Sequence, residues 1–145
     1  MRAIAALLLG ASLVGGAGGA DAGESVEYLY RLHCSGCHGV EGAGSLVGRI
    51  PPFVGIVGHF AGTEEGRLYL VRVPGVANAA LSDDDTARLL NYVLHTWGSA
   101  ELPADARDFT AAEVGKSRET HVDDISRLRA KLGAELAKHG KSIAY

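Results

Sequence analysis

Sulfur-containing side chains are scarce in this sequence. The 145-residue chain has two cysteines, Cys34 and Cys37, and a single methionine, Met1. Two cysteines exclude a framework of several disulfides, and they exclude a four-cysteine zinc site. The formal net charge is only −3, so the chain lacks the strongly basic character typical of nucleic-acid binding, and we expect no nucleic-acid partner.

Long apolar runs are absent except near the N-terminus. Residues 3–14 are largely apolar, but Gly10 and Ser12 interrupt them, and the run is shorter than the about 20 residues that span a bilayer. Arg2 precedes the run and small residues follow it, which is typical of a secretory signal. We predict a signal peptide at residues 1–22, no membrane span in the mature chain, and a periplasmic location.

Both cysteines lie in the stretch HCSGCHG at residues 33–39. Three uses of this pair compete in an exported chain: a disulfide, a zinc site, or covalent attachment of haem. A zinc site lacks further ligands at suitable spacing, and a redox disulfide is expected at the start of a helix in a strand-rich setting. His38 directly follows Cys37, and C-x-x-C-H is the pattern in which two sulfurs bind a haem and the histidine binds its iron. The motif predicts one covalent haem c held by Cys34, Cys37 and His38.

The remaining sequence predicts helices separated by loops. A helix over residues 24–34 leads into the motif, and His33 is interpreted as a histidine at its end. Residues 39–62 hold seven glycines and two prolines, which favours a long loop. A short helix is expected after Thr63, and the clearest helix covers residues 82–98, where Ser82 is a natural N-cap.

The C-terminal third differs in character from the rest. Residues 99–109 are interpreted as a linker, and residues 110–141 are predicted to be helical, with Thr110 and Glu113 as a capping box. An apolar stripe marks one face of this helix: Val122, Ile125, Leu128, Leu132 and Leu136. The stripe needs a partner surface, which is either the chain's own core, a redox enzyme or a second subunit. We predict a domain at residues 23–98 and a helical extension at residues 99–145.

Taken together, the export signal, the helix ending in CSGCH, the PPF loop and the helix that begins LSDDD resemble a small bacterial class I cytochrome c. The resemblance covers residues 24–98. It implies an all-α fold in which the first and last helices of the domain cross around one covalent haem, here with an extra C-terminal amphipathic helix. It also implies that a proline carbonyl accepts a hydrogen bond from the imidazole of His38, a role that falls to Pro51 or Pro52 and is assigned to Pro52.

The sequence departs from this family at the distal iron ligand. The family supplies a methionine shortly before the last helix of the domain, but this chain reads VRVPGVANAALSD there, with Val73 in place of the methionine. Three alternatives remain. His59 is ranked first because imidazole binds iron well, and Asn78 lies in the appropriate loop. The third is a five-coordinate iron beneath an apolar lid made by Val73, Val76 and Leu81.

Arginine binds carboxylates through two parallel hydrogen bonds, so Arg49 and Arg67 are candidates to pair the haem propionates. Arg49 is preferred, and Arg67 is interpreted as a solvated surface charge. The predicted function is electron transfer between redox partners, such as a dehydrogenase and a terminal acceptor, and this needs no catalytic residue. The alternative is a five-coordinate haem protein that binds a diatomic ligand or acts on peroxide, and a haem-free thiol–disulfide protein is a third class.

Overall fold

The computed structural model describes residues 24–143, and the predicted signal peptide lies outside the described residues. Within residues 24–143 the elements are all helices, and the only β-pairing is an isolated bridge between Ser45 and Ile50. The predicted all-α architecture is confirmed. The helices are α1 (Val26–His33), α2 (Ser35–His38), α3 (Val57–Phe60), α4 (Glu64–Arg72), α5 (Pro74–Ala77), α6 (Asp83–Trp97), α7 (Ala111–Glu119) and α8 (Ile125–Lys138).

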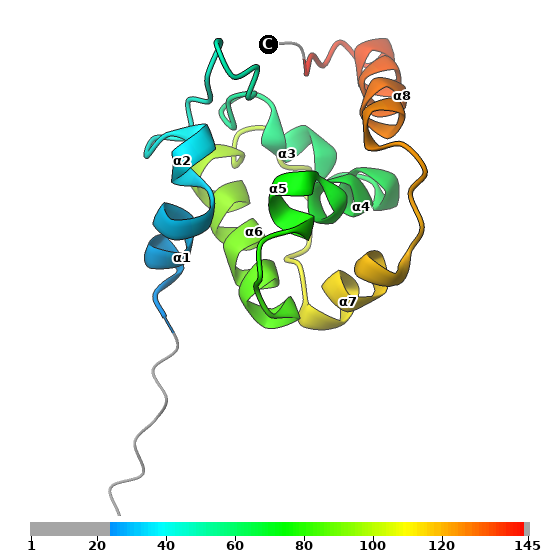
Figure 1. The fold of residues 1–145 in the computed structure, drawn as a ribbon. Coiled ribbons are helices and arrows are strands. Elements are labelled where there is room, and N and C mark those ends of the chain that lie inside the picture. The colour runs from blue at the N-terminus through cyan, green and yellow to red at the C-terminus, as the bar shows by residue number, and fades with distance from the viewer. Residues whose placement is uncertain (1–23, 144–145) are drawn as a thin grey trace, which may run out of the picture.

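Helix α6 is the longest element and packs against α1 (Figure 1). It begins as predicted, because the Ser82 hydroxyl accepts a hydrogen bond from the Asp85 backbone N–H at 3.0 Å, and it ends at Gly98. Apolar side chains recur along its inner face at helical spacing, and they bury against Leu29 and Tyr30 of α1: Leu89, Leu90, Val93 and Leu94. The packing of these two helices places the end of α1, and the motif after it, beside the core.

The loop between α2 and α4 contains one element that the sequence did not predict. Helix α3 lies inside the segment 39–62 that was interpreted as loop, and no side chain caps its start. Val57 and Phe60 are both buried in the core, and this burial stabilises the turn. No local sequence signal predicts it. Earlier in the loop, Gly44 has φ +70°, and a Cβ there would lie 2.3 Å from the Ile50 carbonyl oxygen, so the turn requires glycine.

Helix α4 starts and stops as the sequence predicts. The Thr63 hydroxyl accepts a hydrogen bond from the Gly66 backbone N–H at 3.0 Å, and the helix ends at Arg72, just before Val73 and Pro74. Pro74 then begins the single turn α5, which leads back toward α6. The chain therefore runs from α4 through α5 to α6 along one side of a cavity described below.

The predicted long helix over residues 110–141 is wrong in one respect, because two helices occupy this stretch. Thr120 leaves helical geometry at the end of α7, and Asp124 caps the start of α8 by accepting hydrogen bonds from the N–H groups of Ser126 and Arg127. The Thr110 cap is present, but the Glu113 side chain binds arginines instead of closing a capping box. Strong cap residues thus outweighed the continuous apolar stripe.

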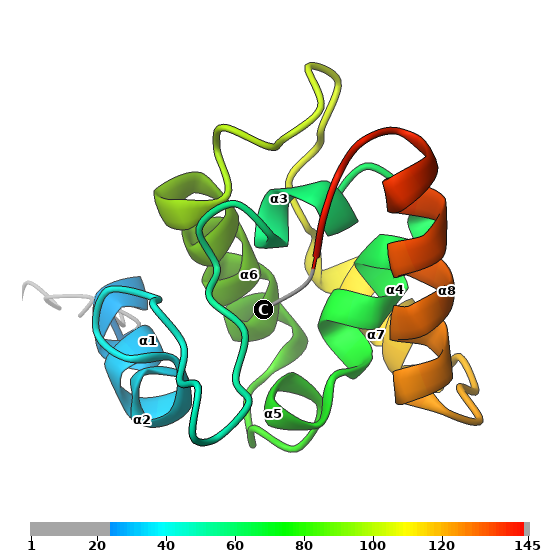
Figure 2. The same cartoon turned by 90° about the horizontal axis from the view of Figure 1, so that it is seen from above.

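The C-terminal extension packs on the rest of the same chain. Helix α7 contacts α4 and α6, and α8 contacts α4 (Figure 2). Phe109, Val114 and Leu132 from this segment are buried in the common core. Of the partner surfaces left open by the sequence, the chain's own core is therefore the one that the structure supplies.

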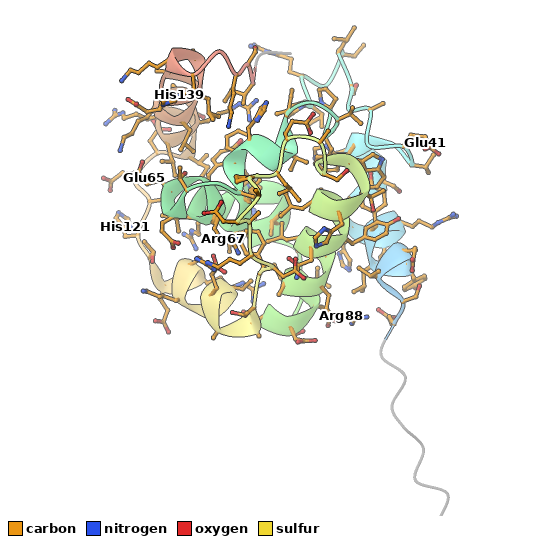
Figure 3. The ribbon with its side chains drawn as sticks, turned by 180° about the vertical axis from the view of Figure 1, so that it is seen from behind. Glu41, Glu65, Arg67, Arg88, His121 and His139 are labelled. Atoms are coloured by element: carbon orange, nitrogen blue, oxygen red, sulfur yellow. The ribbon has the colours of Figure 1, made fainter. Side chains whose placement is uncertain are left out.

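Arg67 anchors this packing. Its side chain is 3% exposed, and its guanidinium binds both carboxylate oxygens of Glu113 at 2.6 and 2.8 Å and the Arg107 carbonyl at 2.8 Å (Figure 3). It also lies over the Phe109 ring at 3.8 Å. Interpreting Arg67 as a solvated charge was wrong, because a buried guanidinium needs an acidic partner and Glu113 provides it.

Within residues 24–143 no helix has the length and apolar character needed to cross a membrane.

Candidate functional site

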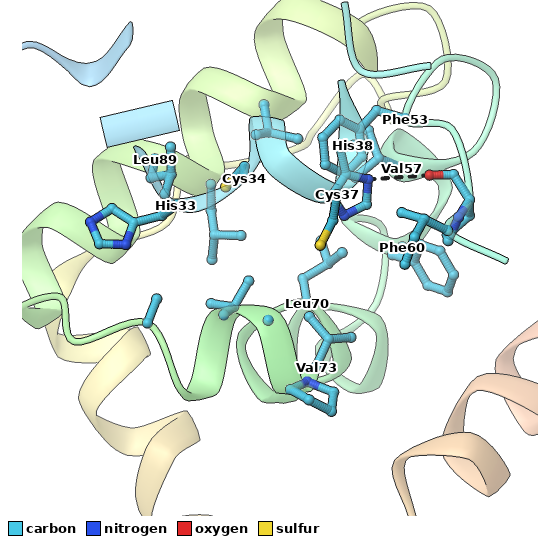
Figure 4. A pocket seen from close by; sticks show the side chains of 18 of the residues that line it. His33, Cys34, Cys37, His38, Phe53, Val57, Phe60, Leu70, Val73 and Leu89 are labelled. Atoms are coloured by element: carbon cyan, nitrogen blue, oxygen red, sulfur yellow. Dashed lines mark hydrogen bonds between the residues drawn. The ribbon is translucent and has the colours of Figure 1, made fainter. Parts of the chain in front are cut away.

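A single helical turn gathers the three residues of the cysteine–histidine motif. The N–H groups of Cys37 and His38 both donate to the Cys34 carbonyl, at 3.2 and 2.9 Å. Residues spaced at i, i+3 and i+4 share one face of a helix, so the two sulfurs and the imidazole point toward the same side (Figure 4). The spacing in the sequence thus places two sulfurs and one imidazole on the same side of a single helical turn.

The imidazole of His38 is fixed in orientation. Its Nδ1 lies 3.2 Å from the Pro51 carbonyl oxygen, and because a carbonyl can only accept, Nδ1 carries the proton and donates. Burial lowers the pKa of His38, while the hydrogen bond to Pro51 opposes that shift, so the ring is neutral at pH 7. A neutral ring that is protonated at Nδ1 leaves the lone pair on Nε2, which is the form that binds a metal.

Pro51, and not Pro52, is therefore the hydrogen-bond acceptor in this structure. Pro52 contributes to the wall of the adjacent cavity. The sequence narrowed the role to two neighbouring prolines, but it could not choose between them, because the choice depends on which carbonyl the loop turns toward His38.

Aromatic rings support His38 from behind. The Phe53 ring stacks on the imidazole with a centroid distance of 4.1 Å and an interplanar angle of 17°. Phe53 in turn contacts Trp97 at 5.7 Å, and Trp97 contacts Tyr30 at 4.7 Å. The Tyr30 hydroxyl donates to the Gly39 carbonyl at 2.6 Å, which ties the turn after the motif to α1. This cluster keeps the imidazole from rotating, since each ring is held by its neighbours.

The two cysteines are not joined to each other. Burial raises the pKa of the Cys34 thiol to about 11, with a smaller contribution from the nearby charge of Cys37. A thiol that exchanges disulfides needs a lowered pKa, so this environment does not suit the thiol–disulfide alternative. Cys37 is exposed, whereas Cys34 is half-buried at the edge of a cavity.

The cavity beside the motif has a volume of about 430 Å³ and is lined mainly by apolar side chains. This size falls within the about 300–1,000 Å³ typical of pockets for organic ligands. Figure 4 shows Cys34, Cys37 and His38 on one side and Leu70 and Val73 on the opposite side. A flat, apolar group attached through both sulfurs and ligated by His38 would fit this space, because the walls match its surface and the only fixed nitrogen base among the described lining residues faces it.

The proposed distal ligands lie elsewhere. Neither His59 nor Asn78 belongs to the described residues that line the cavity, and Asn78 is exposed. The His59 Nδ1 is buried without a hydrogen-bond partner among the described residues, and burial lowers the pKa of this side chain. His33 does line the cavity, but it adjoins Cys34 on the same side as the motif. Val73, Val76 and Leu81, the expected apolar lid, all line the cavity.

Arg49, the preferred partner for a haem carboxylate, is exposed and lies outside the lining of this cavity, with a left-handed φ of 53°. The cavity is instead lined by a different arginine, Arg129 of α8, which the sequence analysis did not select. A signal was present, because Arg129 lies four residues after Ile125 and three before Leu132, on the stripe that packs inward. A charged side chain on a packed helix face needs a polar or charged partner there.

Two cysteines and a carbonyl-fixed histidine thus lie on one helical turn and face an apolar cavity in an all-α fold, an arrangement that suits covalent haem. The chain is 32% identical over 141 residues to a cytochrome c-552 of Thermus thermophilus, and the match covers 83% of this chain and 93% of the relative. A second cytochrome c-552 of the same species is 32% identical over 120 residues, covering 69% of this chain and 91% of the relative. No protein-family model matches.

The chain therefore belongs to the cytochrome c-552 family of c-type cytochromes. This membership confirms the predicted class I cytochrome c fold and implies covalently bound haem c with its iron, as the sequence predicted. It also identifies the chain broadly as a haem-c electron-transfer protein, and such a carrier implies redox partners.

Proposed function

We propose that this chain is an exported, periplasmic electron carrier that binds haem c through Cys34 and Cys37 and ligates its iron through His38. One observation supports this most strongly: the His38 Nδ1 lies 3.2 Å from the Pro51 carbonyl. That hydrogen bond fixes the tautomer and leaves Nε2 as the ligand atom. A structural histidine of the core would not need its second nitrogen directed toward a cavity that two cysteines border.

Each residue has a distinct task in this proposal. The haem supplies a one-electron couple when bound. Cys34 and Cys37 hold one edge of the group by thioether bonds, while the Pro51 hydrogen bond orients His38 and raises its basicity. The Phe53 ring, stacked on the imidazole at 4.1 Å, prevents that ligand from turning. The apolar walls exclude water from the rest of the group.

The partner is a redox protein that approaches the edge near Cys37. Cys37 is exposed, so this edge is the part of the site nearest solvent. Large apolar side chains are exposed on α1 and the following loop around the motif: Tyr28, Leu32, Val40, Leu46, Val47 and Val54. Apolar surface of this kind suits transient docking of another protein. A dehydrogenase as donor and a terminal acceptor remain the partner classes that we propose.

A second function is supported by the distal side of the cavity. Val73, Val76 and Leu81 offer no atom that binds iron strongly. The alternative is thus a haem protein that binds a neutral diatomic molecule on this side. Action on peroxide has less support, because it needs an acid–base group near the reacting atoms, and His59, the candidate for that role, is outside the cavity lining.

The test is redox titration of the full chain produced together with the haem-attachment machinery. We expect haem that stays bound after denaturation and a reversible one-electron couple. The Cys34→Ser/Cys37→Ser variant should retain no covalent haem, whereas the control Ser35→Ala, which alters one of the two residues between them, should retain it fully. A wild-type chain with no covalent haem, or with haem that cannot be reversibly reduced, would contradict the proposal.

A further inference from the structure

A hollow lined by basic side chains adjoins the apolar cavity. This second hollow, of about 780 Å³, lies between the loop around Arg49 and helix α8, and Arg129 lines both this groove and the cavity. The groove is also lined by Arg49 and Lys141, and none of the described residues that line it is acidic. Arg129 therefore lies between the apolar cavity and a hollow that it lines together with two further cations.

The Arg129 guanidinium is held by neighbours from two segments. One Nη donates to the Tyr69 hydroxyl of α4 at 2.9 Å, and the other donates to the Ile143 carbonyl at 3.0 Å. Its central carbon lies 5.6 Å from the Phe60 ring centre and 5.8 Å from that of Tyr69. These oxygens and ring faces stabilise the cation and fix its orientation at the boundary between the two hollows.

The chemistry of the cofactor matches this arrangement. Haem is apolar over most of its area, its vinyl groups are consumed by the two cysteines, and its two carboxylates lie on a different edge. An ionised carboxylate is very costly to bury in an apolar space unless it is paired. The carboxylates must therefore leave the cavity where a cation stands, and among the residues that line the cavity Arg129 is the only lysine or arginine described.

We propose that Arg129, carried by the C-terminal extension, binds the carboxylate edge of the haem, which makes helix α8 part of the haem site. This inference rests on the proposed function, since it requires the haem to be attached at Cys34 and Cys37. The planar guanidinium forms paired hydrogen bonds with a carboxylate, which no lysine can do. Arg49 and Lys141 then add positive charge from the groove side, so Arg49 acts at longer range than the sequence suggested.

The test compares Arg129→Gln with Arg127→Gln, an exposed arginine on the same helix that lines neither hollow. Removing a cation beside the haem favours the oxidised form, so Arg129→Gln should lower the reduction potential. We expect the ratio of oxidised to reduced protein at a fixed potential to rise about tenfold, which is about 59 mV for one electron. Arg127→Gln should leave the potential unchanged.

A second readout separates direct binding from a structural role. An adjacent guanidinium lowers the pKa of a carboxyl group, so Arg129→Gln should move the inflection in a plot of potential against pH to higher pH. Arg129→Lys keeps the charge but not the fork, so its potential should fall between those of wild type and Arg129→Gln. This milder variant decides the matter should Arg129→Gln fail to take up haem.

Two outcomes are distinguishable as contradictions. A wild-type chain without covalent haem overturns the proposed function, and the inference with it. Covalent haem whose potential and pH inflection are the same in wild type, Arg129→Gln and Arg129→Lys overturns the inference alone, because haem attachment and electron exchange would then stand without Arg129.

Discussion

The two walls of the cavity beside the motif are built in opposite ways. The wall that carries the motif is polar and braced, because His38 is held by the Pro51 carbonyl on one side and by the Phe53 ring on the other. The facing wall is made of aliphatic side chains such as Leu70, Val73 and Val76. The first wall holds the Nε2 atom of His38 in position for one bond to iron, in the proposed site. The second wall only has to match an apolar surface.

The difference teaches which part of a cytochrome is constrained by chemistry. In the proposed site, attachment and proximal ligation depend on residues within five positions of one another, so a single helical turn contains them. The facing wall is assembled from a separate segment, after α4, so its side chains vary independently of the motif. Replacement of a thioether by an aliphatic side chain at Val73 predicts a lower reduction potential than a His/Met haem has.

The largest effect should come from removing His38, the proposed iron ligand on the wall that carries the motif. His38→Ala should keep haem attached through Cys34 and Cys37 but lose histidine ligation completely, and optical and electron paramagnetic resonance spectra would report this. His33→Ala is the matched control, since His33 lines the same cavity without the carbonyl contact. Iron ligation that is identical in His38→Ala and wild type would refute the assignment.

The second effect concerns what holds the aliphatic wall in place. Arg67 lies on α4, three residues before Leu70 and six before Val73, and its ion pair with Glu113 ties α4 to α7. Arg67→Met should destabilise the protein by about 3–5 kcal/mol, because Glu113 would be left partly buried without its main partner. Denaturant unfolding measures this.

Arg88→Met provides the control for Arg67→Met. Arg88 pairs with Asp85 on the surface, so its loss should cost less than about 1 kcal/mol. Equal losses in both variants would mean that burial of the Arg67 pair contributes nothing special to the joint between α4 and α7.

A smaller effect should follow from weakening the aromatic support. Phe53→Leu removes the ring stacked on His38 but keeps an apolar side chain, and we expect a loss of about 1–2 kcal/mol in unfolding free energy. The exposed neighbour Val54, changed to Ala, should have little effect. If Phe53→Leu were as stable as wild type, the stacking would be incidental to the order of this wall.

The smallest expected effect is a dependence of stability on acid. Burial alone would raise the pKa of Glu113, but hydrogen bonds from Arg67 and Arg107, together with their charges, lower it overall. The unfolded chain therefore takes up a proton first, at about pH 4.3, so this stabilisation is present above that pH and is lost as the pH falls through the lower folded pKa. Glu113→Gln should flatten that part of the curve of unfolding free energy against pH, and an unaltered curve would contradict this origin.

Much of the local structure around the candidate site was predictable because its signals are local. The C-x-x-C-H spacing, the Ser82 and Thr63 caps and the stop at Gly98 each act within one or two helical turns, and the structure has the helices where these signals place them. For the carbonyl that accepts the hydrogen bond from His38, the sequence left two candidates, Pro51 and Pro52. A choice between adjacent carbonyls depends on loop geometry, which sequence patterns do not encode.

The remaining features depend on contacts between distant segments. Arg67 pairs with Glu113, 46 residues away, and α3 forms only because Val57 and Phe60 are buried in the core. Arg129 reaches the cavity from a helix whose docking site could not be chosen from sequence. Ligand chemistry favours His59, but His59 is not among the described residues that line the cavity, so its role as a distal ligand stays a prediction.

The most direct test of the contrast between the two walls is the optical spectrum of the haem-loaded protein, oxidised and reduced, with and without carbon monoxide. We expect covalent haem with histidine on one side only, so the reduced spectrum should change promptly when carbon monoxide is added, while the reversible one-electron couple of the proposed carrier is present without it. A low-spin spectrum that ignores carbon monoxide would contradict this, because it would mean that a side chain from outside the described cavity lining occupies the sixth position.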